Sequence, residues 1–331
     1  MVMNRQASVQ DAVTYLQNRG KEALDVAVAV IQNENIRYKP LHDALGYFVD
    51  QVFPDIMQPG FLSLYCEAGG GKPSDTVQVG AAIVLFVGAA DLHDDVLDSS
   101  LIKNHKPTVL GKFGKEIAVL AGDAFLIMGT YLLHRAIAGC THEKADAILK
   151  QVKQAFFDLS SAEAEEASHR RKNDLSSDQY LRIIKKKVAV SEATARIGAI
   201  LAGSTEEEVE VLGELGRVLG LLNTLRDEFI DVFEPEELAN RFKNEILPLP
   251  ILQVFQDPQK KAKILGLLKK GNVSKKKTEK IADLVFKAKE TEELREIMLS
   301  KVSATTRKLS HLKGEREILK LLLDLSLDEI L

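Results

Sequence analysis

The sequence predicts an all-α fold in which long helices form one bundle. Apolar residues recur three and four positions apart over most of the 331 residues, which is the spacing of amphipathic helices. Alternating strand patterns closed by Asn-Gly or Asp-Gly turns are missing from the sequence, and only nine prolines interrupt it. No composition shift marks a linker and no segment repeats, so we expect a single domain over residues 1–331.

The helices and their breaks follow in chain order. Residues 116–138 are apolar on most faces, which predicts a helix buried in the middle of the bundle. Residues 206–233 and the tail 316–331 place apolar positions three and four apart, which predicts two more helices. Turn-forming residues predict breaks at 69–75, 100–108, 171–178, 203–205, 246–250 and 271–275.

Composition disfavours several functions. A formal net charge of -4 makes nucleic acid an unexpected partner. Cys66 and Cys140 offer neither a disulfide framework nor metal-ligand spacing, so we expect buried free thiols in a reducing compartment. The first residues lack the apolar core of a secretory signal, and the longest apolar run, 79–90, is too short to cross a bilayer. A soluble, cytoplasmic protein without a membrane span is expected.

Four aspartates lie in the stretch ADLHDDVLDSS at 90–100. Asp91, Asp94, Asp95 and Asp98 stand at i, i+3, i+4 and i+7, so on a helix their carboxylates form one stripe. Without compensation the stripe would destabilise its helix and raise some of the carboxyl pKa values. Mg²⁺ would relieve both effects, because it binds carboxylate oxygens and retains waters or substrate phosphate oxygens.

A second acidic cluster lies in RDEFID at 226–231, where Asp227 and Asp231 are four apart and Glu228 adjoins Asp227. Two facing clusters on buried helices would hold metal ions that neither could hold alone. A solvated acidic patch is the alternative for each cluster. The apolar segments VLFVGAA and GLLNTL that lead into the clusters favour the metal interpretation.

These motifs resemble those of the polyprenyl synthetase family, the trans-isoprenyl diphosphate synthases. The resemblance is colinear over about residues 40–250 and covers both aspartate-rich motifs and the segment of the family's Lys-Thr pair. The matching stretches are HDDVLD at 93–98, KPTV at 106–109, AVLAGDAFL at 118–126, DQYLRIIKKKVAV at 178–190 and GRVLGLLNTLRDEFIDVF at 216–233.

The resemblance implies an all-α single-domain bundle around a deep central cavity, usually dimeric, with the two motifs facing each other across it. In that family three Mg²⁺ ions bridge the motifs to the diphosphate of an allylic substrate. The diphosphate leaves, and isopentenyl diphosphate attacks the allylic cation. The acidic residues suit this chemistry, because metals neutralise the charge that builds on the leaving group.

The resemblance also assigns roles to individual residues. It implies that Asp94, Asp98 and Asp227 bind metal directly. Support through water or hydrogen bonds is implied for Asp95, Glu228 and Asp231. Three lysines are implied to bind diphosphate: Lys187 from the Lys-Thr pair, whose neighbour here is Val188, Lys103 after the first motif, and Lys243, which is offset by one position.

The chain departs from the family at the isopentenyl diphosphate site. The family has a Gly-Gly-Lys-Arg-x-Arg-Pro segment about forty residues before its first motif, where FPDIMQP at 53–59 stands here. Asp55, Ile56 and Gln58 thus replace three cations, and the family's Arg-Arg pair is Lys103-Asn104. Charge-assisted hydrogen bonds contribute roughly 1.5–3 kcal/mol each, so this loss would weaken binding of a second diphosphate by orders of magnitude. The acceptor is therefore isopentenyl diphosphate, if other lysines compensate, or an uncharged molecule.

Further polar residues near the motifs have two readings each. Asp91 could touch the metal cluster or act as a base, although an ion pair with a neighbouring helix is favoured. We expect His93 to pack, and His105 to occupy a loop where the family has glycine. Glu163 and Glu166 match the family's Gln-x-x-Asp, so Glu163 could line the diphosphate site.

The residues before the first motif bear on chain length. In the family an aromatic residue at the fifth position before the motif blocks the prenyl tail. Here that position is Ala89, beside Ala90, which predicts an open cavity for a tail of twenty carbons or more. Phe86, about one turn deeper, is the candidate floor. Tight helix packing is the alternative role of the small residues.

Three functions follow from these features. The favoured one is a Mg²⁺-dependent prenyltransferase that ionises a long allylic diphosphate, as a homodimer or with a homologous subunit. A non-catalytic or regulatory subunit of a heteromeric synthase is the second. The third is a lyase like the terpene cyclases, in which Asp91 would be the base.

Overall fold

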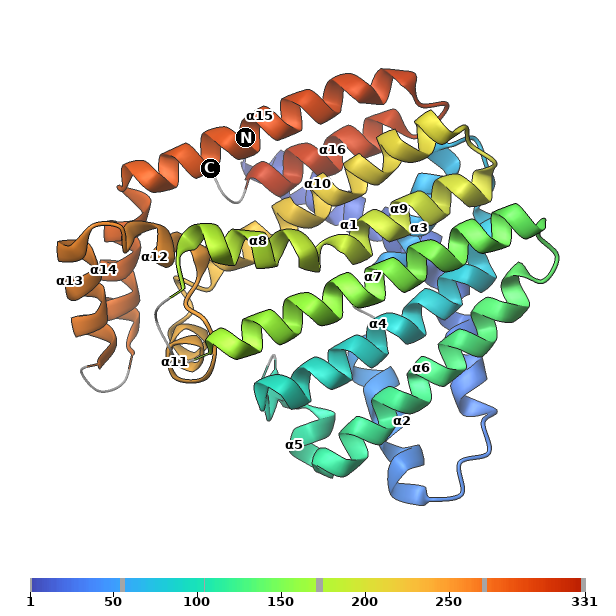
Figure 1. Cartoon of the computed structure of the whole chain (residues 1–331), viewed down its shortest axis with the longest axis horizontal. Coiled ribbons are helices and arrows are strands. Elements are labelled where there is room, and N and C mark those ends of the chain that lie inside the picture. Colours follow the sequence, from blue (N-terminus) through green and yellow to red (C-terminus); the bar gives the residue numbers. More distant parts are fainter. Residues whose placement is uncertain (1, 54–56, 104, 171–174, 270–272, 329–331) are drawn as a thin grey trace. The chain divides into compact units, whose positions relative to one another are not determined.

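The structure is a computed structural model, and it describes residues 2–53, 57–103, 105–170, 175–269 and 273–328. Nearly all of these residues lie in helices (Figure 1). The α-helices of the first half are α1 (Val2–Gln32), α2 (Lys39–Val52), α3 (Gln58–Ala68), α4 (Val77–Asp98), α5 (Val109–Phe113), α6 (Lys115–Ile137) and α7 (His142–His169). Those of the second half are α8 (Ser177–Lys187), α9 (Ala189–Ala202), α10 (Glu206–Ile230), α11 (Pro235–Asn244), α12 (Leu249–Val254), α13 (Pro258–Lys269), α14 (Lys275–Phe286), α15 (Lys289–Lys308) and α16 (Arg316–Asp328).

The predicted all-α class is confirmed. The helices expected at 116–138 and 206–233 are present as α6 and α10, and the one expected at 316–331 is present as α16 over the part of the tail that the structure describes. The small hairpin in the predicted break 100–108 was not predicted. There β1 (Ile102–Lys103) pairs antiparallel with β2 (Lys106–Pro107). His105 lies in the turn with a φ of 60°, a left-handed conformation that glycine adopts without strain.

The chain divides into two compact units, and we describe each by itself. The first unit comprises residues 1–151, 194–212 and 312–315, and the second comprises 152–193, 213–311 and 316–331. The boundaries at 151/152, 193/194 and 212/213 fall within α7, α9 and α10, and the short segment 312–315 lies between helical elements. The prediction of a single domain therefore stays a prediction.

In the first unit α4 packs against α1, α3 and α6. The apolar run that leads to the first acidic cluster explains this position, because residues on several faces of α4 are fully buried. Gly60 of α3 permits the close approach of α1, since a Cβ there would lie 2.2 Å from the Leu16 carbonyl oxygen. Phe125 of α6 stacks edge-on against Phe48 of α2, with ring centroids 5.4 Å apart.

In the second unit α12 packs against α8, α14 and α15. Phe229 of α10 is 2% exposed and lies against Phe286 of α14, with ring centroids 5.5 Å apart. Ser176 and Gln179 cap the start of α8 reciprocally, which fixes the helix that carries Tyr180 and Lys187. This core therefore supports the end of α10, where the second acidic cluster lies.

Two expectations about burial need correction. The helix α6 is not buried on most of its faces, because Leu120, Ile127 and Tyr131 are 51%, 68% and 61% exposed. These three residues form an exposed apolar face that is used below. Cys66 is a buried free thiol as expected, whereas the free thiol Cys140 is only partly buried.

Two helical segments are long and apolar enough to cross a membrane, judged by length and composition alone: Pro73–Asp98 and Lys115–Ile137. Such helices are weak evidence for a span, because the core helices of soluble proteins pass the same test. The packing of α4 against three other helices is that of a core helix.

Candidate active site

The first acidic cluster occupies the last two turns of α4, so its four aspartates share one helix as predicted. Asp95 is buried, and Asp91, Asp94 and Asp98 are half-buried. The pKa of Asp95 is raised to about 7, chiefly by burial; Lys103 opposes the shift, and Asp91, Asp94 and Asp98 add to it. The cluster is thus an electrostatically costly arrangement within a protein core.

Lys103 compensates part of this charge. Its ammonium lies 2.6 Å from an oxygen of Asp91 and 3.8 Å from one of Asp95. Burial lowers the pKa of Lys103, but Asp91 and Asp95 outweigh burial, so its pKa is raised overall. Asp91 therefore forms the expected ion pair, with a strand of the hairpin instead of a neighbouring helix. The neighbour of Lys103, Asn104, lies outside the described residues.

The other residues of α4 divide between two sides of the helix. His93 packs on α6, where a Cβ at Gly122 would lie 2.4 Å from its Nε2, and it lies 3.3 Å from Asp123. Phe86 also faces α6, because a Cβ at Gly129 would lie 3.0 Å from its ring. Ala89 is 2% exposed.

Val87, Gly88 and Asp91 line a different space, a pocket of about 330 Å³ in the first unit. Phe86, Ala89 and Ala90 are not among its lining residues. Ala90 is half-buried. Their predicted role in holding the prenyl chain stays a prediction.

The second acidic cluster lies at the end of α10 in the second unit. Asp227 presents a side chain that is 63% exposed, and its neighbour Arg226 lies 3.2 Å from it. Glu228 is buried, and Asp231 follows the last residue of the helix. The two clusters belong to different units, so their facing across a cavity stays a prediction.

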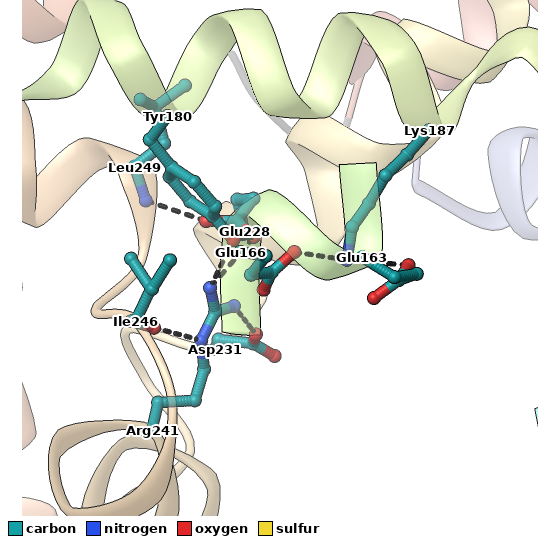
Figure 2. A network of polar contacts seen from close by, with 9 residues as sticks. All are labelled: Glu163, Glu166, Tyr180, Lys187, Glu228, Asp231, Arg241, Ile246 and Leu249. Atoms are coloured by element: carbon teal, nitrogen blue, oxygen red, sulfur yellow. Dashed lines mark hydrogen bonds and ion pairs between the residues drawn. The ribbon is translucent and has the colours of Figure 1, made fainter. Parts of the chain in front are cut away.

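Glu228 and Asp231 are held by a network that the sequence analysis did not foresee (Figure 2). Arg241 of α11 donates to Glu228 at 3.0 Å and to Asp231 at 2.5 Å. Tyr180 donates its hydroxyl to Glu228 at 2.8 Å, and the backbone N–H of Leu249 donates to the other carboxylate oxygen at 2.6 Å. Both oxygens of Glu228 are therefore occupied by protein donors.

The electrostatics of the network follow from its burial. Burial raises the pKa of Glu228, while Arg241, the Leu249 N–H and the Tyr180 hydroxyl act against that shift. The acidic partners outweigh burial at Arg241 and hold its pKa well above the ordinary value, so it stays charged. Arg241 also donates its Nε–H to the carbonyl of Ile246 at 2.8 Å.

Arg241 is the residue that sequence reasoning missed, because attention went to Lys243 two positions later. Lys243 is exposed on α11, and its diphosphate role stays a prediction. One signal could have identified Arg241. Replacing the family's middle aspartate by the longer Glu228 suggests a new partner, and Arg241 is a nearby cation within an amphipathic segment.

Lys187, predicted to bind the allylic diphosphate, has acidic neighbours on α7. Its ammonium lies 3.1 Å from Glu163 and forms a closer ion pair with Glu166, as Figure 2 shows. Glu163 and Glu166 are three apart on one helix, so both carboxylates reach the same lysine. Val188, which replaces the threonine of the family pair, is buried.

The segment that replaces the family's isopentenyl diphosphate motif is only partly described. Asp55 and Ile56 lie outside the described residues. Gln58 begins α3 and lines the pocket of the first unit. At positions 55 and 56 the absence of a cation is therefore known from the sequence alone, and only Gln58 is also described in the structure.

The donor set fits a hard divalent cation, although no group of three Asp, Glu, His or Cys side chains in the described ranges is arranged to hold one. Asp94 and Asp98 are half-buried and four apart, and Asp227 is exposed. The carboxyl of Asp95, on the same helix, is buried. Mg²⁺ commonly binds through one or two carboxylates together with water and substrate phosphates.

The chain combines an all-α fold with two aspartate-rich clusters, one on α4 and one at the end of α10. Residues 57–285 match the pattern of the polyprenyl synthetase family, and the chain belongs to that family. Membership confirms the family resemblance.

Individual relatives agree with this assignment. The chain is 30% identical over 182 residues to "Short chain isoprenyl diphosphate synthase" of Methanothermobacter thermautotrophicus, covering 55% of each chain. It is 29% identical over 240 residues to "Octaprenyl diphosphate synthase" of Escherichia coli, covering 70% of this chain and 72% of that one. The match thus spans about half the length of the first of these relatives.

The fold agrees with a solved structure, that of geranylgeranyl pyrophosphate synthetase from Pyrococcus horikoshii. The TM-score is 0.84 with 22% identity, and the match covers 97% of this chain and 99% of that one. At this identity the likeness establishes the fold.

Proposed function

We propose that the protein is a Mg²⁺-dependent prenyltransferase that ionises a long-chain allylic diphosphate in isoprenoid biosynthesis. The observation that carries the proposal is the stripe on α4, where Asp94, Asp95 and Asp98 lie close together and Lys103 pairs with Asp91 and Asp95. Binding of metal and diphosphate at the stripe would offset the repulsion among these carboxylates. The names of the two relatives above, both prenyl diphosphate synthases, support the same reaction.

In this proposal Asp94 and Asp98 are Mg²⁺ ligands, and Asp227 is a further proposed ligand, with about three ions bound by analogy with the family. When bound, the metal would neutralise the charge on the departing diphosphate. Asp95 supports these ligands through water or a hydrogen bond, as the family resemblance implies. Arg241 acts by orienting Asp231 and the end of α10.

Lys187 takes part in diphosphate binding by exchanging partners. Glu163 and Glu166 hold its ammonium in the absence of substrate. A diphosphate oxygen would have to compete with these two carboxylates, so binding at Lys187 is a substitution of one anion for another. Lys103 and Lys243 are the further proposed contacts.

A long tail is supported by the residues before the first motif. Ala89 and Ala90 are small, and Phe86 lies against Gly129 one turn deeper. Each methylene placed in an apolar cavity contributes about 0.8 kcal/mol, so an open cavity favours long chains. One relative is named as a short chain synthase and the other as an octaprenyl synthase, so the names agree with either a short or a long product.

We also propose a cytoplasmic homodimer, in which a second copy covers the exposed apolar face of α6. Leu120, Ile127 and Tyr131 are more than half exposed in one chain, and a face of this kind is typical of an interface. A homologous subunit is the alternative occupant. A regulatory subunit and a cyclase-like lyase remain the alternative functions. In the lyase, Asp91 would have to leave its ion pair with Lys103 to act as the base.

The test is incubation of the purified chain with Mg²⁺ and farnesyl or geranylgeranyl diphosphate, with and without isopentenyl diphosphate. Released pyrophosphate and extracted prenyl products are both quantified. The proposal expects pyrophosphate release that is faster with the longer substrate. Release of hydrocarbon or alcohol alone would favour the lyase. No release by the chain alone, with activity restored by a copurifying homologous chain, would favour the subunit.

A further inference from the structure

The helices α13 and α14 carry a local excess of positive charge. Residues 263–282 contain seven lysines and one acidic residue, Glu279, in a chain whose formal net charge is -4. The two helices pack against each other within the second unit, and five residues separate them in the sequence (Figure 1). The end of α13 and the start of α14 therefore lie together, and we call this part the loop end of the helix pair.

The loop end presents four exposed lysines, namely Lys269, which ends α13, and Lys275, Lys276 and Lys280 of α14. The side of α14 that faces the core includes Ile281, Ala282 and Val285, which are buried. The helical period places positions 276 and 280 opposite that side. The ammonium groups therefore point to solvent.

The lysines farther from the loop end have acidic partners. Lys260 lies 3.4 Å from Glu290, and Lys287 lies 3.0 Å from Asp283. By contrast, the four lysines of the loop end form no ion pair with an acidic residue in the part of the chain that the structure describes. Residues 270–274, which connect the two helices, include no acid that could neutralise them. The positive charge of the loop end is thus left to solvent.

The start of α14 adds to this charge. Lys275, Lys276 and Lys277 occupy its first turn, and that turn contains no acidic residue. Because the N-terminus of a helix carries a partial positive charge, three cations placed there destabilise the helix. An anion supplied from outside the chain would offset this cost.

The residue types of the loop end favour one kind of anionic partner. Residues 263–282 contain no arginine and no aromatic residue, which are the side chains that protein and nucleic-acid interfaces favour. No large apolar side chain in the described part of α13 and α14 is exposed, so the surface offers charge without a group that could insert. Clusters of four to eight basic residues of this kind are attracted to anionic lipid surfaces.

We infer that the loop end, with Lys269, Lys275, Lys276 and Lys280, docks the protein on a membrane surface that contains anionic lipids. The inference goes beyond the proposed function, because docking needs neither substrate nor metal. Docking would bring the proposed long-chain product to a bilayer, into which each methylene of its tail partitions favourably.

The experiment is cosedimentation of the full-length protein with phosphatidylcholine vesicles that contain either no anionic lipid or about 30% phosphatidylglycerol. Salt is set at about 0.05 M and at about 0.3 M. We expect binding to the anionic vesicles alone. We also expect that binding to weaken by about tenfold or more at the higher salt, because screening acts on every exposed ammonium.

The variant Lys269→Gln/Lys275→Gln/Lys276→Gln/Lys280→Gln removes the four charges. Each lysine near an anionic surface corresponds to about fivefold in partitioning, so we expect a loss of about 100-fold or more. The matched control Lys21→Gln/Lys115→Gln/Lys153→Gln/Lys320→Gln removes four exposed lysines of α1, α6, α7 and α16 and changes the net charge equally. It should bind within about threefold of the wild type. Circular dichroism checks that both variants are folded.

The inference is overturned if the loop-end variant binds anionic vesicles as well as the wild type, or if the control loses as much binding. Equal binding to vesicles without anionic lipid also overturns it. Duplex DNA and polyglutamate are the competing polyanions. Binding to either of them by a protein that leaves the anionic vesicles unbound would assign the surface to that polyanion and overturn the inference.

Pyrophosphate release from geranylgeranyl diphosphate is measured without lipid on the same three proteins. We expect equal rates, because the loop-end lysines have no role in the proposed reaction. Absence of release together with intact docking would remove the proposed function and leave the membrane surface in place. Release at the wild-type level without docking would do the reverse.

Discussion

Arg241 should be the residue whose loss destabilises the second unit most. It is 5% exposed and bonds Glu228 and Asp231 together with the Ile246 carbonyl. Removing one partner of a buried ion pair costs about 3–5 kcal/mol, because the other charge is left uncompensated. Glu228 would keep the donors Tyr180 and Leu249, so we expect the lower end, about 3 kcal/mol, for Arg241→Met.

The assay is urea denaturation followed by circular dichroism at 222 nm, since the sequence has no tryptophan. A double-mutant cycle with Glu228→Gln isolates the pair. We expect the double variant to be more stable than the sum of the single effects by about 2 kcal/mol. The matched control is Arg217→Met, which removes an exposed arginine that pairs with Glu192 in the same unit and should cost less than about 1 kcal/mol.

The loss of stability caused by Arg241→Met should also depend on pH. Burial raises the pKa of Glu228, and Arg241 opposes that shift, so losing Arg241 raises the pKa further. A carboxyl with a raised folded-state pKa contributes stability below its unfolded pKa and loses it as pH rises through the folded value. The destabilisation by Arg241→Met should therefore shrink on going from pH 8 to pH 5.5. A cost below about 1 kcal/mol, or one that grows on acidification, would refute the network's role.

Three further predictions follow from the sites. Asp227→Asn should weaken Mn²⁺ binding in the presence of pyrophosphate, by about tenfold in an electron paramagnetic resonance titration; Asp231→Asn should mainly lower stability, and equal effects on Mn²⁺ would contradict this. Ala90→Phe should shorten the longest prenyl product seen by chromatography; an unchanged length would exclude Ala90 from the cavity. Burial raises the pKa of Cys66 to about 12, so at pH 8 Ellman's reagent should modify Cys140 first and Cys66 only after denaturation; equal rates would contradict the burial.

The fold was predictable because its signals are local. The apolar periodicity of 116–138 and 206–233 predicted α6 and α10, and the i, i+3, i+4, i+7 spacing predicted the aspartate stripe of α4. The apolar face of α6 was misassigned to the core, because periodicity cannot distinguish a buried apolar face from an exposed one.

The partners of charged residues were not predictable in the same way. Lys103 reaches Asp91 through a two-residue hairpin that has no alternating pattern to announce it. Arg241 reaches Glu228 because α11 folds back beside α10, which depends on tertiary packing. The match to family motifs directed attention to Lys187 as a phosphate ligand, yet it gave no sign that Glu163 and Glu166 would hold it.

The most direct test of the central proposal is a single-turnover measurement of pyrophosphate release from geranylgeranyl diphosphate. The comparison is wild type with Mg²⁺, wild type with EDTA, and Asp94→Asn/Asp98→Asn with Mg²⁺, with the exposed Asp11→Asn of α1 as the control. We predict release that needs Mg²⁺, falls about a hundredfold or more in the double variant and is unchanged in the control. Release that persists in EDTA, or in the double variant at the wild-type rate, would contradict the assignment of the α4 aspartates to a metal-diphosphate site.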